Sequence, residues 1–345
     1  MHVILSAPES ELFLLEELRR GFPHAVHGTR APGLIVSNLG LQPEAPPTLA
    51  FARQLLPDVT EHAASSVSAW ALTLLESIGR RMPEGQPWLL HIEPFYKRGS
   101  AGLHRCKLIR EAFRELLQQK RRQLLRSLQP ETPRFTLAQS FVQLLLTAPD
   151  RGLISLAAAP APNLLRRVMS PFPLGEVPVP SDKEAPSRAF AKLVEAEIRL
   201  GCKIARGHRC VDLGAAPGGW SYVALQRGAR VVAVDHAPLR ADLIKNRHLK
   251  FLKADPCSYV PESPVDWLLC DGIASPERSV SLLIDWVRHH RARRFVLTIK
   301  FKDHEDYLLL DHLKHALPPM CDEFFLTHLC ANKNEACAFG IVRES

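Results

Sequence analysis

The sequence predicts an α/β chain in which a Rossmann-like, mostly parallel sheet of seven strands follows an α+β region. Two observations lead to this prediction. From Arg209 onward, short apolar segments alternate with helical stretches, and the first segment runs into a glycine-rich turn. Repeated βα units of this kind form doubly wound sheets. Before that point the order is helix, strand, helix, strand with proline-rich interruptions, which is typical of a small α+β unit.

The length of 345 residues suggests two or three domains. We expect an N-terminal α+β subdomain over 1–50, a second region over 51–170 and the α/β domain over 171–345. No apolar run reaches the roughly 18 residues of a membrane span, and the first residues lack a secretory pattern. The eight cysteines show no C-x-x-C spacing. We therefore expect a cytoplasmic protein with reduced thiols and no bound metal.

The spacing of apolar residues predicts each element in order. In the first half, helices are expected over 9–20 and 63–82, and a basic helix follows the strand at 88–92. The strands of this half are expected at 3–5, 33–36, 88–92, 141–146 and 153–159. The seven strands of the second half are expected at 210–213, 230–235, 249–252, 265–270, 295–300, 324–329 and 336–342.

The formal net charge is +8, and much of the basic excess lies between Lys97 and Arg134. A positive field of this kind attracts polyanions such as RNA, with phosphate contacts that are sensitive to salt. The alternative is the solvated face of an amphipathic helix whose other side carries Ile109, Phe113 and Leu117. The candidate RNA-binding residues are Lys97, Arg98, Arg105, Lys107, Arg110, Arg114, Lys120, Arg121 and Arg122.

The glycine-rich turn reads Asp212-Leu213-Gly214-Ala215-Ala216-Pro217-Gly218-Gly219-Trp220. A strand, a turn of small residues and a helix leave open space at the carboxyl edge of the sheet, where such sheets bind ligands. Pro217 and Asp212 disfavour a dinucleotide, whose G-x-G-x-x-G fingerprint binds a pyrophosphate. Acids at the ends of successive strands favour a cationic nucleoside, S-adenosylmethionine. The Asp235 carboxylate would accept hydrogen bonds from its ribose hydroxyls. The alternative is a structural turn that binds no ligand. These acids are Asp212, Asp235, Asp255 and Asp271.

Lys300 closes an apolar strand, an unusual place for an ammonium group because its desolvation is costly. Such a lysine can act as a general base, or its side chain can simply reach to the sheet edge. Asp271 is expected at the same edge, Lys192 on a helix ahead of the glycine-rich strand, and Glu335 near the final strand. Together they form a candidate Lys/Asp/Lys/Glu set, although Glu335 taken alone is typical of a solvated loop. Competing lysines nearby are Lys183 and Lys302.

Several motifs make the chain resemble the FtsJ-type (RrmJ-like) ribose 2′-O-methyltransferases. They are Ser187-Arg188-x-x-x-Lys192-Leu193, the turn over 212–220, Cys270-Asp271-Gly272 and Ile299-Lys300. Phe51-Ala52-Arg53-Gln54 and the overall layout resemble RlmM-like enzymes, which carry a THUMP RNA-binding domain ahead of the catalytic domain. The resemblance implies a class I methyltransferase domain behind a THUMP-like region, active as a monomer without a membrane partner. It also implies methylation of a cytidine ribose in large-subunit (23S) ribosomal RNA before subunit assembly.

The resemblance further implies roles for individual residues. Lys192, Asp271, Lys300 and Glu335 would form the catalytic tetrad, with Lys300 accepting the proton, Asp271 orienting Lys300 and Glu335 positioning Lys192. The donor pocket would be lined by Ser187, Gly214, Ala216, Pro217, Gly218, Gly219, Trp220, Asp235, Asp255 and Asp271. The alternatives are a 2′-O-methyltransferase of tRNA or of a cap, an inactive RNA-binding protein with this fold, and a nicotinamide oxidoreductase.

Overall fold

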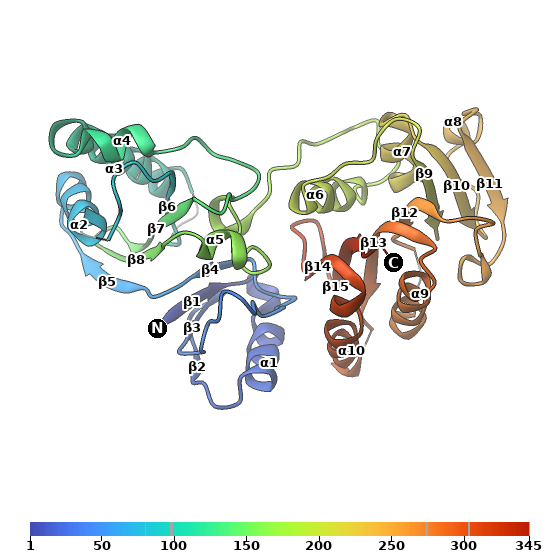
Figure 1. The fold of residues 1–345 in the computed structure, drawn as a ribbon, viewed down its shortest axis with the longest axis horizontal. Helices are drawn as coiled ribbons and strands as arrows, with labels where there is room; N and C mark the ends of the chain where they lie inside the picture. Colours follow the sequence, from blue (N-terminus) through green and yellow to red (C-terminus); the bar gives the residue numbers. More distant parts are fainter. Residues whose placement is uncertain (80, 97–98, 273–274, 303, 345) are drawn as a thin grey trace. The chain divides into compact units, whose positions relative to one another are not determined.

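A computed structural model describes the chain except for residues 80, 97–98, 273–274, 303 and 345 (Figure 1). It divides into two compact units, residues 1–176 and 177–345. The finer division at 1–50, 51–170 and 171–345 stays a prediction. All eight cysteines are thiols outside any disulfide. No helix in the described part of the chain is long and apolar enough to cross a bilayer.

The first unit begins with a four-stranded sheet in the order β2-β3-β1-β4. Its central strand β1 pairs antiparallel with β3 and with β4. The prediction missed two strands of this sheet, because β2 is largely exposed and polar and β4 has only three residues. The elements are β1 (His2–Leu5), α1 (Glu11–Gly21), β2 (His27–Ala31), β3 (Leu34–Ser37) and β4 (Gln54–Leu56).

A second four-stranded sheet follows, in the order β5-β8-β7-β6, with β6 parallel to β7 and the other pairs antiparallel. Trp70, Trp88 and Phe113 are fully buried in the core between this sheet and its helices. The prediction missed β5, a short polar strand. The elements are β5 (Thr60–Ala63), α2 (Val67–Gly79), β6 (Trp88–Pro94), α3 (Ser100–Lys120), α4 (Arg122–Ser127), β7 (Ser140–Ala148), β8 (Arg151–Ala157) and α5 (Ala161–Leu164).

The basic segment folds largely as α3 and α4. The apolar side of α3 is buried, and several cations fall on its outer side. Three described members of the predicted RNA-binding set form ion pairs within the protein: Arg110 with Glu93 at 3.4 Å, Arg121 with Glu84 at 3.5 Å and Lys107 with Glu111 at 3.9 Å. Arg105 donates to the Pro149 carbonyl at 2.8 Å. The exposed residues of the set are Lys107, Arg114, Lys120 and Arg122, and the predictions for Lys97 and Arg98 lie outside the described residues.

The second unit holds a seven-stranded sheet in the order β11-β10-β9-β12-β13-β15-β14. Neighbouring strands are parallel except that β15 runs antiparallel to β13 and β14. The predicted fold class, a mostly parallel seven-stranded α/β sheet, is confirmed. The strands are β9 (Arg209–Leu213), β10 (Arg230–Asp235), β11 (Leu249–Lys253), β12 (Val265–Cys270), β13 (Ala292–Lys300), β14 (Cys321–Thr327) and β15 (Glu335–Val342).

Helices lie on both faces of this sheet (Figure 1). On one face, α6, α7 and α8 share a core with the strands around Leu193, Trp220 and Trp267. On the other, α9 packs on β13 and α10 on α9. Because β9, β10, β12 and β13 are parallel, their carboxyl ends meet at one edge. The helices are α6 (Phe190–Leu200), α7 (Gly219–Gln226), α8 (Ala241–Ile244), α9 (Pro276–Arg288) and α10 (Leu309–Ala316).

Candidate active site

Glycines bring the backbone at the ends of β9 and β12 into direct contact. Gly214 has a left-handed φ of +69°, and a Cβ on Gly272 would lie 2.1 Å from the Gly214 carbonyl oxygen. Gly218, at φ +109°, likewise has the left-handed conformation that favours glycine and precedes α7. Side chains are therefore excluded where the chain turns at the carboxyl edge of the sheet, as the sequence predicted.

Asp235 is fixed to the glycine-rich loop at the end of β10. Its two carboxylate oxygens accept hydrogen bonds from the backbone N–H groups of Ala216 and Ala237, each at 2.9 Å. A carboxylate has further lone pairs, so Asp235 can still accept from a bound ligand. Ser187 lies against the same loop, since a Cβ on Gly219 would come within 2.6 Å of its hydroxyl oxygen.

Two predicted donor-pocket residues have evident structural contacts. Trp220 is buried, and its indole N–H donates to the Ala189 carbonyl at 2.8 Å, which ties α7 to the start of α6. Asp255 accepts from the Cys257 N–H at 3.1 Å and from the Ser258 hydroxyl at 2.9 Å, so it caps a short 3-10 turn. Their roles in donor binding stay a prediction.

Asp212 presents no charged surface at this edge. It is 1% exposed and accepts a hydrogen bond from the Ser221 hydroxyl at 2.7 Å, which joins β9 to α7 beneath the loop. Burial raises the pKa of its carboxyl to about 7, although the Ser221 hydrogen bonds act in the opposite direction. Of the four strand-end acids, Asp212 is thus a structural element rather than a lining residue.

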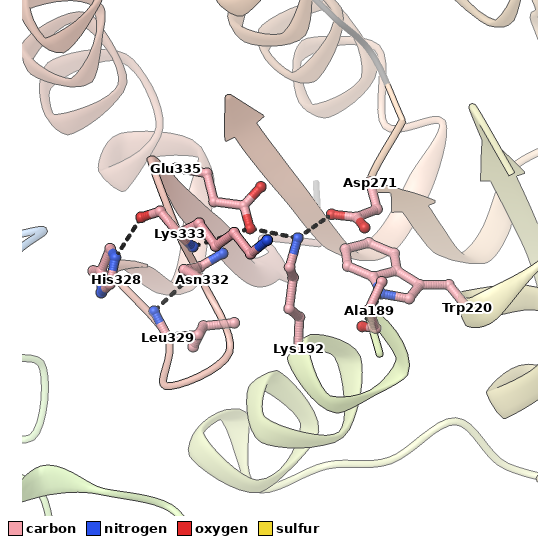
Figure 2. A network of polar contacts seen from close by, with 9 residues as sticks. All are labelled: Ala189, Lys192, Trp220, Asp271, His328, Leu329, Asn332, Lys333 and Glu335. Carbon is pink, nitrogen blue, oxygen red and sulfur yellow. Dashed lines mark hydrogen bonds and ion pairs between the residues drawn. The ribbon is translucent and has the colours of Figure 1, made fainter. Parts of the chain in front are cut away.

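Lys192 joins two carboxylates from different parts of the sheet (Figure 2). Its Nζ lies 2.9 Å from an Asp271 oxygen and 2.6 Å from a Glu335 oxygen, and the Lys192 side chain is 8% exposed. Burial acts to lower the pKa of Lys192, but these carboxylates outweigh it and raise the pKa. Burial likewise acts to raise the pKa of Glu335, and the Lys192 contact lowers it overall. Lys192 is therefore held as a cation and Glu335 as a carboxylate, so these two groups carry opposite charges.

Lys300, the fourth predicted residue, closes β13 directly across the antiparallel ladder from Glu335. Its side chain is half-buried and makes no ion pair with a carboxylate among the residues that the structure describes. The expected contact between Glu335 and Lys192 is present. Asp271, expected to orient Lys300, instead contacts Lys192. The set is thus gathered at one edge, with Lys192 engaged by both acids.

A network of hydrogen bonds that sequence reasoning missed holds the segment before Glu335 in place (Figure 2). The Asn332 side chain accepts from the Leu329 N–H at 2.6 Å, and His328 contacts the Lys333 carbonyl at 2.8 Å. Buried Glu195, one turn after Lys192 on α6, accepts from the Cys330 N–H at 2.8 Å. The same helix therefore fixes both Lys192 and the loop that carries Glu335. The polar run 332–335, Asn-Lys-Asn-Glu, between two apolar segments is the signal that could have revealed it.

The chain is similar to known methyltransferases over part and over most of its length. A model of the FtsJ-like methyltransferase family matches residues 185–310. The chain is 39% identical over 137 residues to ribosomal RNA large subunit methyltransferase M of Azoarcus sp. (strain BH72), a match that spans only 38% of each chain. The protein of the same name from Xanthomonas oryzae pv. oryzae (strain KACC10331 / KXO85) is 30% identical over 262 residues, 73% of this chain and 70% of that one.

The family match over 185–310 lies within the unit of the seven-stranded sheet and identifies an FtsJ-like methyltransferase domain there. The longer match then narrows the class: the chain belongs to the ribosomal RNA large subunit methyltransferase M family.

The residues at the carboxyl edge fit S-adenosylmethionine. The Gly214–Gly272 contact leaves backbone without side chains there, and Asp235 offers a fixed carboxylate to ribose hydroxyls. Carboxylates also suit the positive charges of this molecule. The match to the methyltransferase family confirms the prediction of S-adenosylmethionine as the cofactor.

Proposed function

We propose that this protein methylates a ribose 2′-hydroxyl of RNA, at a cytidine of large-subunit ribosomal RNA. The observation that carries the proposal is the gathering of Lys192, Asp271 and Glu335 at the carboxyl edge, with Lys300 across the ladder from Glu335. The family to which the chain belongs supports a ribosomal RNA substrate.

The two lysines would act differently. Lys192 is held as a cation by two carboxylates, and its raised pKa makes it a poor proton acceptor. Lys300 forms no ion pair with a described carboxylate, so it is the lysine of the two whose side chain can turn toward a bound ribose. Lys300 would therefore take the proton of the 2′-hydroxyl, while Lys192 fixes Asp271 and Glu335 around it.

S-adenosylmethionine supplies an activated methyl group when bound. Ser187, Asp235 and Asp271 would hold it, with Asp235 accepting from its ribose. The donor is already reactive, so much of the rate enhancement would come from orienting the ribose oxygen toward the methyl group. The exposed cations of α3 and α4 would bind structured RNA, which proteins recognise largely through shape and unpaired bases. We place this reaction in the cytoplasm, on RNA not yet assembled into the subunit.

Transfer of a labelled methyl group to unmodified total RNA tests the proposal. We expect the label in large-subunit RNA, in a dinucleotide that resists alkali because its 2′-oxygen is methylated. Label in alkali-sensitive mononucleotides would contradict ribose methylation. Label in tRNA or in a cap would keep the chemistry and replace the substrate. Donor binding without transfer to any RNA would favour an inactive RNA-binding protein.

A further inference from the structure

A basic groove of about 550 Å³ lies at the opposite edge of the second unit's sheet, at the amino ends of β9, β10, β11 and β12. Arg209, Arg230, Arg247 and Lys250 line it together with Tyr259. The active-site edge begins at Asp235, at the other end of β10. Five residue steps of about 3.3 Å separate Arg230 from Asp235, so the groove lies roughly 17 Å from the donor site.

The groove exists because one crossover of the sheet lacks an α-helix. An α-helix follows each of β9, β10 and β12, namely α7, α8 and α9. Between β11 and β12 the described chain forms only the 3-10 turn η3 (Pro256–Ser258). Pro256, Pro261 and Pro264 explain this absence, because proline disfavours a helix interior. Without a helix there, part of this sheet face stays uncovered, although parallel sheets are ordinarily covered on both faces.

Strand register places Arg209, Arg230 and Lys250 on that uncovered face, and Arg247 lies just before β11. Arg230 pairs with Arg209, and two residues further along Val232 pairs with Val211 and with Lys250. Residues two apart on a strand point to the same side of a sheet. Val232 is accordingly only half-buried and Lys250 is exposed, whereas Val231, on the other face, is buried in the core.

The groove carries an excess of positive charge. The Arg209 guanidinium donates to the hydroxyl and carbonyl oxygens of Ser263, which are neutral. Among the described residues, none of the four cations that line the groove forms an ion pair. Glu262 is the one carboxylate among the lining residues. A concave surface with an excess of one sign concentrates the opposite charge, so its complement is a polyanion.

We propose that this groove binds the sugar-phosphate backbone of the RNA substrate as a second contact, remote from methyl transfer. The inference rests on the proposed function, which supplies an RNA substrate. Four cations in one groove match successive phosphates, and Tyr259 at its lining offers a ring on which an unpaired base can stack. At roughly 17 Å from the donor site, this contact strengthens RNA binding and takes no part in the chemical step.

The test compares two double variants of the full chain. Arg230→Ala/Lys250→Ala removes two groove cations, both exposed and outside any described ion pair. Arg288→Ala/Arg293→Ala is the matched control, since it removes two exposed arginines that do not line the groove. Affinity for a labelled large-subunit RNA fragment is measured against salt concentration, alongside donor affinity, kcat and KM.

We expect the groove variant to bind RNA about tenfold more weakly at low salt, with a salt slope smaller by about two. Its KM for RNA should rise in parallel, while kcat and donor affinity stay unchanged. Wild-type RNA affinity and slope in the groove variant, with methylation intact, would overturn the groove and leave the proposed function standing. An equal loss of RNA affinity in the control variant would also overturn the proposal. So would a groove variant that keeps its RNA affinity but binds phosphatidylserine vesicles more weakly. A wild type that binds the RNA but methylates none would instead count against the proposed function.

Discussion

Lys192 is the residue on which the arrangement of the site depends, because two acidic side chains approach it within 2.9 Å. Removing its charge leaves Asp271 and Glu335 close together and partly desolvated. Breaking a buried ion pair by removing one partner costs about 3–5 kcal/mol. We expect Lys192→Met to lower the free energy of unfolding in urea by about 3 kcal/mol and to abolish methyl transfer.

A second substitution separates the charge from the packing of Lys192. Lys192→Met/Glu335→Gln should recover part of the lost stability, because only one carboxylate then remains beside the methionine, and it should stay inactive. Lys203→Met, at an exposed position just after the same helix, should change neither property. A fully stable Lys192→Met protein would show that the ion pairs do not hold the site together.

A substitution of Asp235 tests the donor site separately from the catalytic residues. Asp235→Ala removes the carboxylate proposed to accept from the ribose and releases the Ala216 and Ala237 N–H groups. We expect S-adenosylmethionine to bind at least tenfold more weakly, since a hydrogen bond to a charged group contributes about 1.5–3 kcal/mol. Isothermal titration measures it, with Asp242→Ala, an exposed acid on α8, as the control. Unaltered donor affinity would refute the ribose role.

At the scale of elements, Asp212 couples β9 to α7 and makes stability depend on pH. Its folded-state pKa, about 7, lies above its ordinary value of 3.8, so the folded protein binds more protons than the unfolded chain between these values. The free energy of unfolding should therefore fall as pH rises from about 4 to 7, by up to about 4 kcal/mol. Asp212→Asn should remove this slope in urea unfolding curves.

The control for that slope is Glu262→Gln, which changes an exposed acid. It should leave the pH dependence as in the wild type. A slope that persists in Asp212→Asn would assign the effect to other groups.

The elements also show how far the sequence alone could be interpreted. Six of the seven strands of this sheet are mostly buried apolar runs. The edge strand β11 is partly exposed but keeps Leu249, Phe251 and Leu252, so the apolar pattern predicted all seven. Exposed β2 and three-residue β4 carry no such signal. The burial of Asp212 could not be predicted, because an aspartate at the end of a strand has the same sequence neighbours whether it is buried or lines a ligand site. The contacts of Lys192 join three distant segments. Their expected places near one sheet edge grouped these residues, and the resemblance to a known family assigned their roles, but the contact between Lys192 and Asp271 was not predicted.

At the scale of the whole molecule, the two compact units divide the work in the proposed function. The unit over 177–345 holds the donor residues and the candidate tetrad, and the unit over 1–176 holds the basic helix. We expect the fragment 177–345 to bind S-adenosylmethionine with the affinity of the full chain, and to lose methylation of large-subunit RNA. Full RNA methylation by the fragment would show that the first unit is dispensable.

The proposed reaction depends on Lys300 as the group that accepts the proton of a ribose 2′-hydroxyl. Its most direct test is single-turnover methyl transfer to unmodified large-subunit RNA by the wild type, Lys300→Ala and Lys302→Ala, followed by alkaline digestion. Removal of a general base typically costs 10²–10⁴-fold in rate. We predict this loss of rate for Lys300→Ala, with donor affinity unchanged. Lys302→Ala should form the labelled alkali-resistant dinucleotide at the wild-type rate. A Lys300→Ala protein that forms the labelled dinucleotide at the wild-type rate would show that Lys300 is not the proton acceptor.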